Sequence, residues 1–333
     1  MPAWCDPLGL ALGVALDRLI ADPQSAAHPV AVFGRVAARV EKSLYADKKA
    51  HGVAYVAICV GGATALGVLA QRVPRARTVV TAVATWAVLG GTTLAREGEY
   101  MADALEGHHL EGDDLEGDSR KGDDLEGDGR KGDGLERARA RLPHLCGRDP
   151  SHLEAKELAR ATVESLAENT SDAVVAPLFW GAVAGVPGLL AYRAINTLDA
   201  MVGHRSPRYE RFGWAAARLD DVANYVPARL TGLLTVLTGP DPGRALAVLR
   251  RDGHRHPSPN AGRCEAAFAG ALGVTLGGTN VYQGRTEHRP TMGDGPEPDV
   301  KDIRRAVRLT RAVSLAAAGA AVLTAWALRN RRK

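Results

Sequence analysis

A dense set of carboxylate and carboxamide residues lies between residues 164 and 229, among apolar segments such as PLFWGAVAGVPGLLAY and NYVPARLTGLLTVL. Burying such groups costs free energy unless they bind a ligand or one another. Their density in this stretch therefore predicts a functional site. The members of the set are Glu164, Glu168, Asn169, Asp172, Asn196, Asp199, Asp220, Asp221 and Asn224.

Three groups within this set have helical spacing, so each group can present its polar side chains on one face of a helix. Carboxylate and amide oxygens suit Mg²⁺, which usually also binds substrate phosphates. The alternative for any one group alone is a solvated helix face with ion pairs between neighbouring turns. The groups are Glu164 with Glu168, Asn196 with Asp199, and Asp220 and Asp221 with Asn224, and the cations near them are Arg193, Arg218 and Arg229.

Several motifs here resemble a known family. The runs AENTSDAVVAPLFWG, AINTLDAMVGH, FGWAAARLDDVANYVPARLTG and HPSPNAG are similar to those of the adenosylcobinamide-phosphate synthases, also called cobinamide synthases, of cobalamin (vitamin B12) biosynthesis. The resemblance extends from the first residues to about Gly293 and omits one insert. The segment DRLIADPQSAAHPVAVFGR also resembles the family, which makes Asp17, Asp22 and His28 candidate site residues.

The resemblance implies an ATP-dependent ligase that joins adenosylcobyric acid to (R)-1-amino-2-propanol or its O-phosphate. The product would be adenosylcobinamide or its phosphate. In such a reaction ATP converts a propionate into an acyl phosphate, and the amine then displaces phosphate. The chemistry needs Mg²⁺, cations that stabilise the transferring group and a base for the ammonium nucleophile. ATP and Mg²⁺ are therefore the expected cofactors, and the corrinoid and the aminopropanol are the expected substrates.

The resemblance and this chemistry together suggest roles for the polar residues. Glu164 or Glu168 is the expected base, whereas the cluster that meets ATP and the cluster that meets the corrin are left open. His256 has no carboxylate or third histidine close by in sequence, so we interpret it as solvated or facing substrate. The catalytic set is Glu164, Glu168, Asn169, Asp172 and Arg218; the substrate and ATP set is Asp17, Asp22, His28, Arg193, Asn196, Arg229, His256, Ser258 and Asn260; the metal ligands are Asp199, Asp220, Asp221 and Asn224.

The composition indicates a helical protein with few strands, because the 333 residues are 46% hydrophobic but only 5% aromatic. Residues 53–70, 78–95 and 312–328 carry no charge and approach the length of about 20 residues that crosses a bilayer. A further window, 173–192, is interrupted by Pro177 and Pro187. Core helices of a soluble bundle are the alternative. We predict an all-α, polytopic integral membrane protein.

Residues 1–333 are predicted to form a single membrane-embedded domain. Residues 106–136 are low in complexity, with LEGDSRKGDD followed by LEGDGRKGDG, and are predicted to be a disordered insert because they hold almost no apolar side chains. After this insert, Ser151 and Glu154 have the spacing of a capping box for a helix that continues through Glu168.

The partners expected from the sequence are a lipid bilayer and the substrates. The net charge of +4 comes from dispersed arginines, so nucleic-acid binding is not expected. The family also allows a homo-oligomer or association with later enzymes of cobalamin assembly. Because ATP is cytoplasmic, we expect a multi-pass protein of the cytoplasmic membrane with its site facing the cytoplasm. A membrane transporter and a Mg²⁺-dependent membrane prenyltransferase are the alternative functions.

Overall fold

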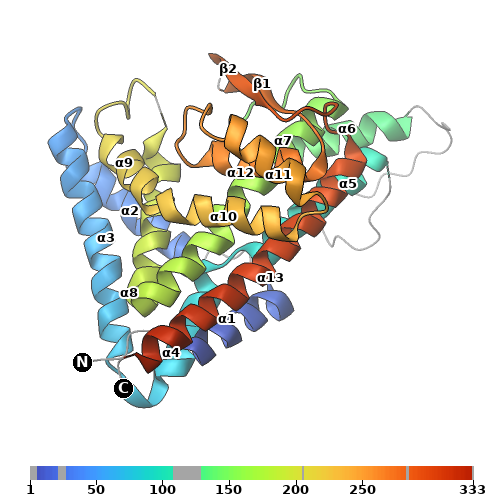
Figure 1. Cartoon of the computed structure of the whole chain (residues 1–333). Helices are drawn as coiled ribbons and strands as arrows, with labels where there is room; N and C mark the ends of the chain where they lie inside the picture. Colours follow the sequence, from blue (N-terminus) through green and yellow to red (C-terminus); the bar gives the residue numbers. More distant parts are fainter. Residues whose placement is uncertain (1–5, 22–27, 108–128, 205, 283–284, 332–333) are drawn as a thin grey trace, which may run out of the picture.

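The protein is almost entirely helical, as predicted (Figure 1). The computed structural model describes residues 6–21, 28–107, 129–204, 206–282 and 285–331. Its long elements are α1 (Pro7–Ile20), α2 (Pro29–Leu44), α3 (Lys49–Gln71), α4 (Arg77–Val88), α5 (Gly91–Glu106), α6 (Gly129–Arg141), α7 (Ala155–Thr170), α8 (Ala176–Leu198), α9 (Trp214–Ala223), α10 (Tyr225–Thr238), α11 (Pro242–Asp252), α12 (Ala261–Leu272), β1 (Leu276–Tyr282), β2 (Arg285–Met292) and α13 (Val300–Asn330).

Four helical stretches are long and apolar enough to cross a membrane, which indicates a membrane protein. Each of them contains one of the four apolar windows predicted from the sequence, 53–70, 78–95, 173–192 and 312–328. The window 78–95 is split, because α4 ends at Val88 and the extended backbone of Leu89 precedes α5. The four stretches are Lys49–Gln71, Arg77–Glu106, Ala155–Gly203 and Val300–Asn330.

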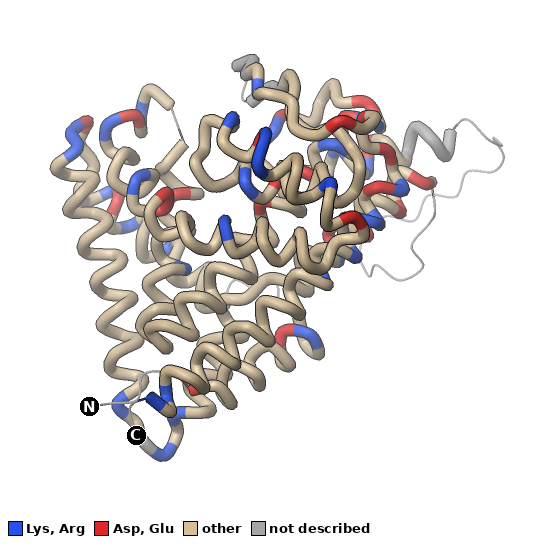
Figure 2. The backbone as a smooth tube through the Cα atoms, in the orientation of Figure 1, with Lys and Arg blue, Asp and Glu red and all other residues tan. Residues whose placement is uncertain are grey.

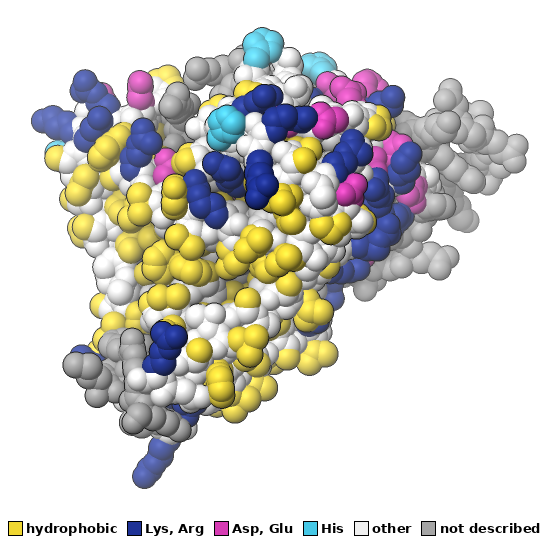
Figure 3. Space-filling view, in the orientation of Figure 1, with side chains coloured by type: hydrophobic (Ala, Val, Ile, Leu, Met, Phe, Trp, Pro, Cys, Tyr) yellow, Lys and Arg dark blue, Asp and Glu magenta, His cyan; other side chains and the backbone are white. Residues whose placement is uncertain are grey.

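Charged side chains gather at one end of the bundle, where α9, α11, α12 and the β1–β2 hairpin lie (Figures 1 and 2). We call this the polar end. The loop between α3 and α4, with Arg72, Arg75 and Arg77, lies at the opposite end beside the last turn of α13. On the face shown in Figure 3, apolar side chains cover the part between these two ends. A single apolar belt between two charged ends is the pattern that a bilayer requires.

The stretch 155–203 is a helical hairpin. Within α8, Gly185 has φ 67° and ψ −151°, which reverses the chain. The hydroxyl oxygen of Tyr192 lies 3.3 Å from the carbonyl oxygen of Asp172, 20 residues away. A continuous helix would separate these residues by about 30 Å, so the two legs must run antiparallel. The chain stays helical at Pro177, where an interruption was expected, because the π segment Ser171–Val175 directly before it continues the helix. The reversal at Gly185 lies two residues before Pro187, the second proline expected to interrupt this window.

Two π-helical segments, Ser171–Val175 and Asp199–Gly203, stand at the polar ends of the two hairpin legs. They contain Asp172 and Asp199, two of the predicted site residues. Single π turns inside helices occur frequently at functional sites. Both legs therefore leave regular α geometry at the level of the predicted site.

Two local predictions need correction or remain open. A capping box does begin α7, but Glu154 is the N-cap and Glu157 its partner, whereas the Ser151 N–H donates to Asp149 within a preceding turn. In the region 106–136, α5 ends at Glu106 and α6 already begins at Gly129, so its last residues are helical. Residues 108–128 lie outside the described residues, and the insert there stays a prediction.

We expect Gly185→Ala to destabilise the protein. A φ of 67° with ψ −151° is open essentially to glycine alone, and a side chain there costs about 1–3 kcal/mol. Gly61→Ala on α3 is the matched control, because a Cβ at Gly61 would meet no atom within 4 Å. Unfolding of both detergent-purified variants by heat measures the difference. Equal stability of the two variants would contradict the hairpin geometry.

Candidate functional site

A small cavity at the polar end brings together residues that are far apart in the sequence. Its volume is about 30 Å³, and α7, the first π segment, α9, α10 and the loop before α12 contribute to its wall. Four separate parts of the predicted set meet in this one place. The predicted residues that line it are Glu168, Asp172, Asp220, Asn224, Ser258 and Asn260.

A hydrogen-bond network orders the wall of the cavity. Tyr192, which the sequence analysis did not select, donates its hydroxyl proton to Asn224 Oδ1 at 2.9 Å. Asn224 in turn donates through Nδ2 to Asp220 Oδ2 at 3.0 Å. Asn196 donates to Asp172 Oδ2 at 3.3 Å. The network thus joins the second hairpin leg to the carboxylates of the first leg and of α9.

Asp220 titrates close to neutral pH. Burial and, to a smaller extent, the negative charge of Asp199 together raise the pKa of this carboxyl to about 7. The hydrogen bond from Asn224 acts in the opposite direction. A carboxyl group with this pKa can accept or release a proton at physiological pH, which an ordinary aspartate cannot do.

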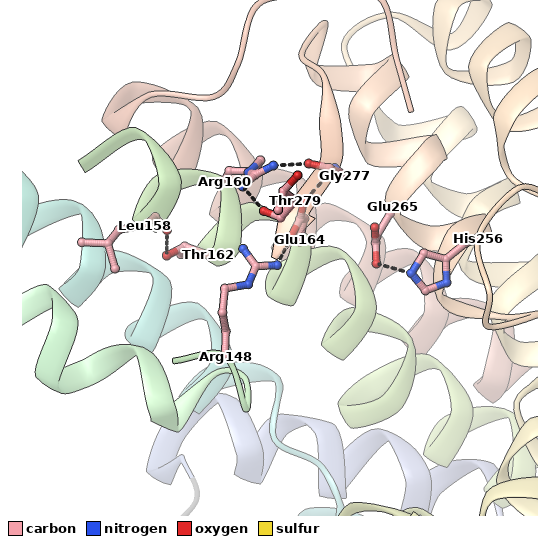
Figure 4. Close-up of polar contacts among 9 residues, drawn as sticks. All are labelled: Arg148, Leu158, Arg160, Thr162, Glu164, His256, Glu265, Gly277 and Thr279. Carbon is pink, nitrogen blue, oxygen red and sulfur yellow. Dashed lines mark hydrogen bonds and ion pairs between the residues drawn. The ribbon is translucent and has the colours of Figure 1, made fainter. Parts of the chain in front are cut away.

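Glu164 anchors the β-hairpin to α7 (Figure 4). One of its carboxylate oxygens pairs with Arg148 Nη2 at 2.5 Å, and the other accepts from the Gly277 N–H at 2.7 Å. Arg160 donates to the carbonyls of Gly277 and Thr279, so both arginines and Glu164 hold β1. Since both oxygens of Glu164 are used, Glu168 is the predicted base whose side chain lines the cavity.

Glu265 and His256 form a buried pair that the sequence analysis missed (Figure 4). Glu265 is 1% exposed, and its Oε1 lies 3.8 Å from His256 Nε2. Burial raises the pKa of Glu265 well above its ordinary value, with a further contribution from the Glu164 and Glu168 carboxylates. Burial also lowers the pKa of His256 to about 4. His256 is therefore neutral at physiological pH, and its Nδ1 accepts from the Ser258 N–H at 3.0 Å.

A sequence signal for Glu265 did exist. It is the single acidic residue in the otherwise mostly apolar helix AGRCEAAFAGAL. Its isolation, with no polar partner one helical turn away, is the reason it escaped selection. Arg148 escaped selection for the same reason, because its partner Glu164 is 16 residues away in the sequence.

Other predicted residues lie outside the cavity. Asp17 lines a separate cavity, and the ring of His28 packs edge-on against Trp86. Asn169 donates to the carbonyl of Leu145 at 3.3 Å. Asp22 lies outside the described residues. Among the described residues of the N-terminal motif, Asp17 and His28 therefore do not line the acidic cavity.

The predicted cations are placed differently from one another. Arg193 donates to Asn196 Oδ1 at 3.5 Å and so adjoins the network. Arg218 is exposed and pairs with Asp221 at 3.3 Å, while Asp221 also accepts from Asn260 through its main-chain carbonyl. Arg229 stacks on the Tyr225 ring, 3.4 Å from its centroid. Of the three, Arg193 is the cation that the hydrogen-bond network includes.

Within the described ranges, no group of three or more His, Cys, Asp or Glu side chains is arranged as a metal site. Mg²⁺ commonly uses only one or two carboxylates together with water and substrate phosphates. Asp172 and Asp220 line the same cavity and would suit that kind of binding. The predicted metal roles of Asp199, Asp220, Asp221 and Asn224 remain predictions.

The fold and the cavity together define a helical membrane protein with an acidic, hydrogen-bonded site at one end. Residues 10–114 and 120–310 match the family described as CobD/Cbib protein, so the chain belongs to this family of cobalamin biosynthesis. The resemblance seen in the sequence is thereby confirmed. The break in the match, at residues 115–119, falls within the predicted insert.

Similar proteins carry the name "Cobalamin biosynthesis protein CobD". One from Mycobacterium tuberculosis is 50% identical over 331 residues, covering 98% of this chain and 96% of the relative. One from Geobacter metallireducens is 41% identical over 311 residues, covering 89% of each. One from Rhodobacter capsulatus is 55% identical over 175 residues, 52% of this chain and 56% of the relative. No solved structure matches the chain.

We expect Arg148→Gln to destabilise the protein by about 3–5 kcal/mol, because it leaves the Glu164 carboxylate buried without its counter-charge. Arg218→Gln is the control, since its ion pair with Asp221 is exposed and contributes about 0–1 kcal/mol. Unfolding of the purified variants in detergent measures both effects. A stable Arg148→Gln protein would show that the pair does not anchor the hairpin.

Proposed function

We propose that this protein is an ATP-dependent ligase. It would form the amide bond between a propionate of adenosylcobyric acid and the amine of (R)-1-amino-2-propanol or of its O-phosphate. The observation that carries the proposal is the meeting of six predicted polar residues from separate segments in one cavity. Membership of a biosynthetic family supports this function over a transporter or a prenyltransferase.

The size of the cavity limits what can enter it. A volume of about 30 Å³ is close to that of one water molecule, so the cavity would receive only the reacting end of a substrate. ATP and the corrinoid would lie over its mouth, near the β-hairpin that Glu164 and Arg160 hold. ATP with Mg²⁺ would supply the phosphoryl group that activates the propionate, and Asp172 and Asp220 are the residues suited to hold the metal.

The chain's own residues would handle the proton of the amine. An alkylamine is an ammonium ion at neutral pH and must lose a proton before it can attack. Glu168 lines the cavity and can accept that proton, whereas Asp220 and Asp172 are the carboxylates suited to the metal. The nitrogen then attacks the acyl carbon, the bond from that carbon to the phosphate oxygen breaks, and phosphate leaves. Tyr192 and Asn224 would keep Asp220 in place.

The test is to incubate the detergent-purified protein with ATP, Mg²⁺, adenosylcobyric acid and either aminopropanol or its O-phosphate. We expect the amide product by mass spectrometry, and the better of the two amines identifies the substrate. Asp220→Asn should slow product formation by about 100-fold or more, because it removes a negative charge suited to Mg²⁺ but keeps the size of the side chain.

Glu297→Gln serves as the control for this assay, because Glu297 is an exposed carboxylate at the polar end. It should leave the rate unchanged. Failure of the wild-type protein to form any amide would overturn the ligase proposal. A normal rate for Asp220→Asn would instead show that the chemistry occurs away from this cavity.

We also propose that the polar end faces the cytoplasm, because ATP is available there. This orientation puts the loop with Arg72, Arg75 and Arg77 outside, against the usual preference of basic loops for the cytoplasm. With the native cysteines replaced, Arg75→Cys should react with a membrane-impermeant maleimide on intact cells. Glu210→Cys, at the polar end, should react only after lysis. The reverse pattern would place the site out of reach of ATP.

A further inference from the structure

A second and larger cavity lies between α1, α5 and α13. Its volume is about 460 Å³, and Val174 of the first π segment forms part of its wall. The N–H of Gly90, just before α5, donates to the carbonyl of Ala173 at 3.1 Å. Since Ser171 and Asp172 line the candidate site, the π segment separates the two cavities. The charged residues of the second cavity are Asp17, Arg18, Arg96, Glu99 and Arg311.

The three arginines of this cavity each adjoin an uncharged run. Arg96 follows the run 78–95, and Arg311 precedes the run 312–328. The other ends of these two runs adjoin Arg77 and Arg329. Arg18 follows the shorter run 8–16 and Asp17, and it lines the same cavity as Arg96 and Arg311. Because the apolar runs would lie in the lipid core, we expect the three guanidinium groups at its edge, where lipid headgroups lie.

The positive charge in this cavity is only partly balanced. Arg311 pairs with Glu99 at 2.8 Å. The carboxylate of Asp17 accepts from the N–H and the hydroxyl of Thr92, at 3.2 Å and 3.0 Å, and so caps α5. Arg18 and Arg96 are exposed, and neither forms an ion pair with another residue of the described ranges. Among the described residues, these two guanidinium groups of the cavity have no counter-charge.

Apolar side chains continue from the cavity toward the middle of the membrane. Val14 lines the cavity one turn before Arg18 on α1, and Leu315 is 57% exposed on α13, one turn beyond Arg311. Apolar side chains of this kind suit acyl chains, whereas arginines at the edge of the apolar layer suit phosphate. A free phosphate ion would make no use of these apolar side chains.

We propose that this cavity binds the phosphodiester headgroup of an anionic phospholipid. Arg18 and Arg96 contact the phosphate, and the acyl chains lie along Val14 and Leu315. An anionic lipid is preferred over a zwitterionic one, because the ammonium of a zwitterionic headgroup would lie close to two guanidinium groups that have no counter-charge among the described residues. The site is distinct from the candidate ligase site and does not depend on the proposed function.

Native mass spectrometry of the full-length protein in detergent tests the proposal, with phosphatidylglycerol and phosphatidylcholine of the same acyl chains as probes. We expect phosphatidylglycerol to bind about ten times more tightly than phosphatidylcholine, a difference of about 1.4 kcal/mol. The double variant Arg18→Gln/Arg96→Gln should lose that preference. Because both side chains are exposed and unpaired among the described residues, this variant should keep its melting temperature.

Arg329→Gln/Arg331→Gln is the matched control, since these two exposed arginines lie at the opposite end of α13. It should keep the preference for phosphatidylglycerol. An equal loss in both double variants, or no loss in either, would overturn the proposal. Displacement of phosphatidylglycerol by an equimolar amount of inorganic phosphate would overturn it too, because it would show a site for the free ion.

Discussion

This structure depends on one constraint: the carboxylates buried at the end of the apolar part of the bundle must each have a partner. Each such group costs free energy unless a partner compensates for lost water. Here the partners come from other segments: Arg148 for Glu164, Asn196 for Asp172, and Asn224 for Asp220. The fold therefore has to bring distant segments to one level of the bundle. The turn at Gly185 and the two π segments accomplish this for the central hairpin.

The contacts of Glu164 also connect the candidate site to the β1–β2 hairpin. Glu164 accepts from Arg148 with one oxygen and from the first residues of β1 with the other. Gly277 has φ 89°, and a Cβ there would lie 2.3 Å from the Pro290 carbonyl, so the two strands can approach closely only with glycine at this position. The β-hairpin is thus held by residues of α7 itself. Any movement of the hairpin would change the surroundings of the buried carboxylates beneath it.

The sequence predicted the helical class, the four apolar stretches and most of the residues around the cavity. Polar residues within apolar runs were an adequate signal for Asp172, Asn196 and Asp220. The sequence could not show that Tyr192 meets Asn224 or that His256 approaches Glu265, because these contacts depend on tertiary packing. Helix breaking was assigned to Pro177 and Pro187, and the chain reverses only next to the second. The reversal needed the backbone freedom of Gly185, which is not visible from residue type alone.

The helical hairpin also bears on how the chain enters the bilayer during synthesis. Asp172 and its partners Tyr192 and Asn196 stand on the two legs of one hairpin, with sequence separations of only 20 and 24 residues. Contacts this local can form early, before the later helices have been made. The two legs can therefore insert as a unit whose polar groups already satisfy one another, so that lipid never has to solvate an isolated aspartate. The acidic cavity would then be completed from the aqueous side, when α9 packs against the hairpin and Asp220 joins the residues that line the cavity.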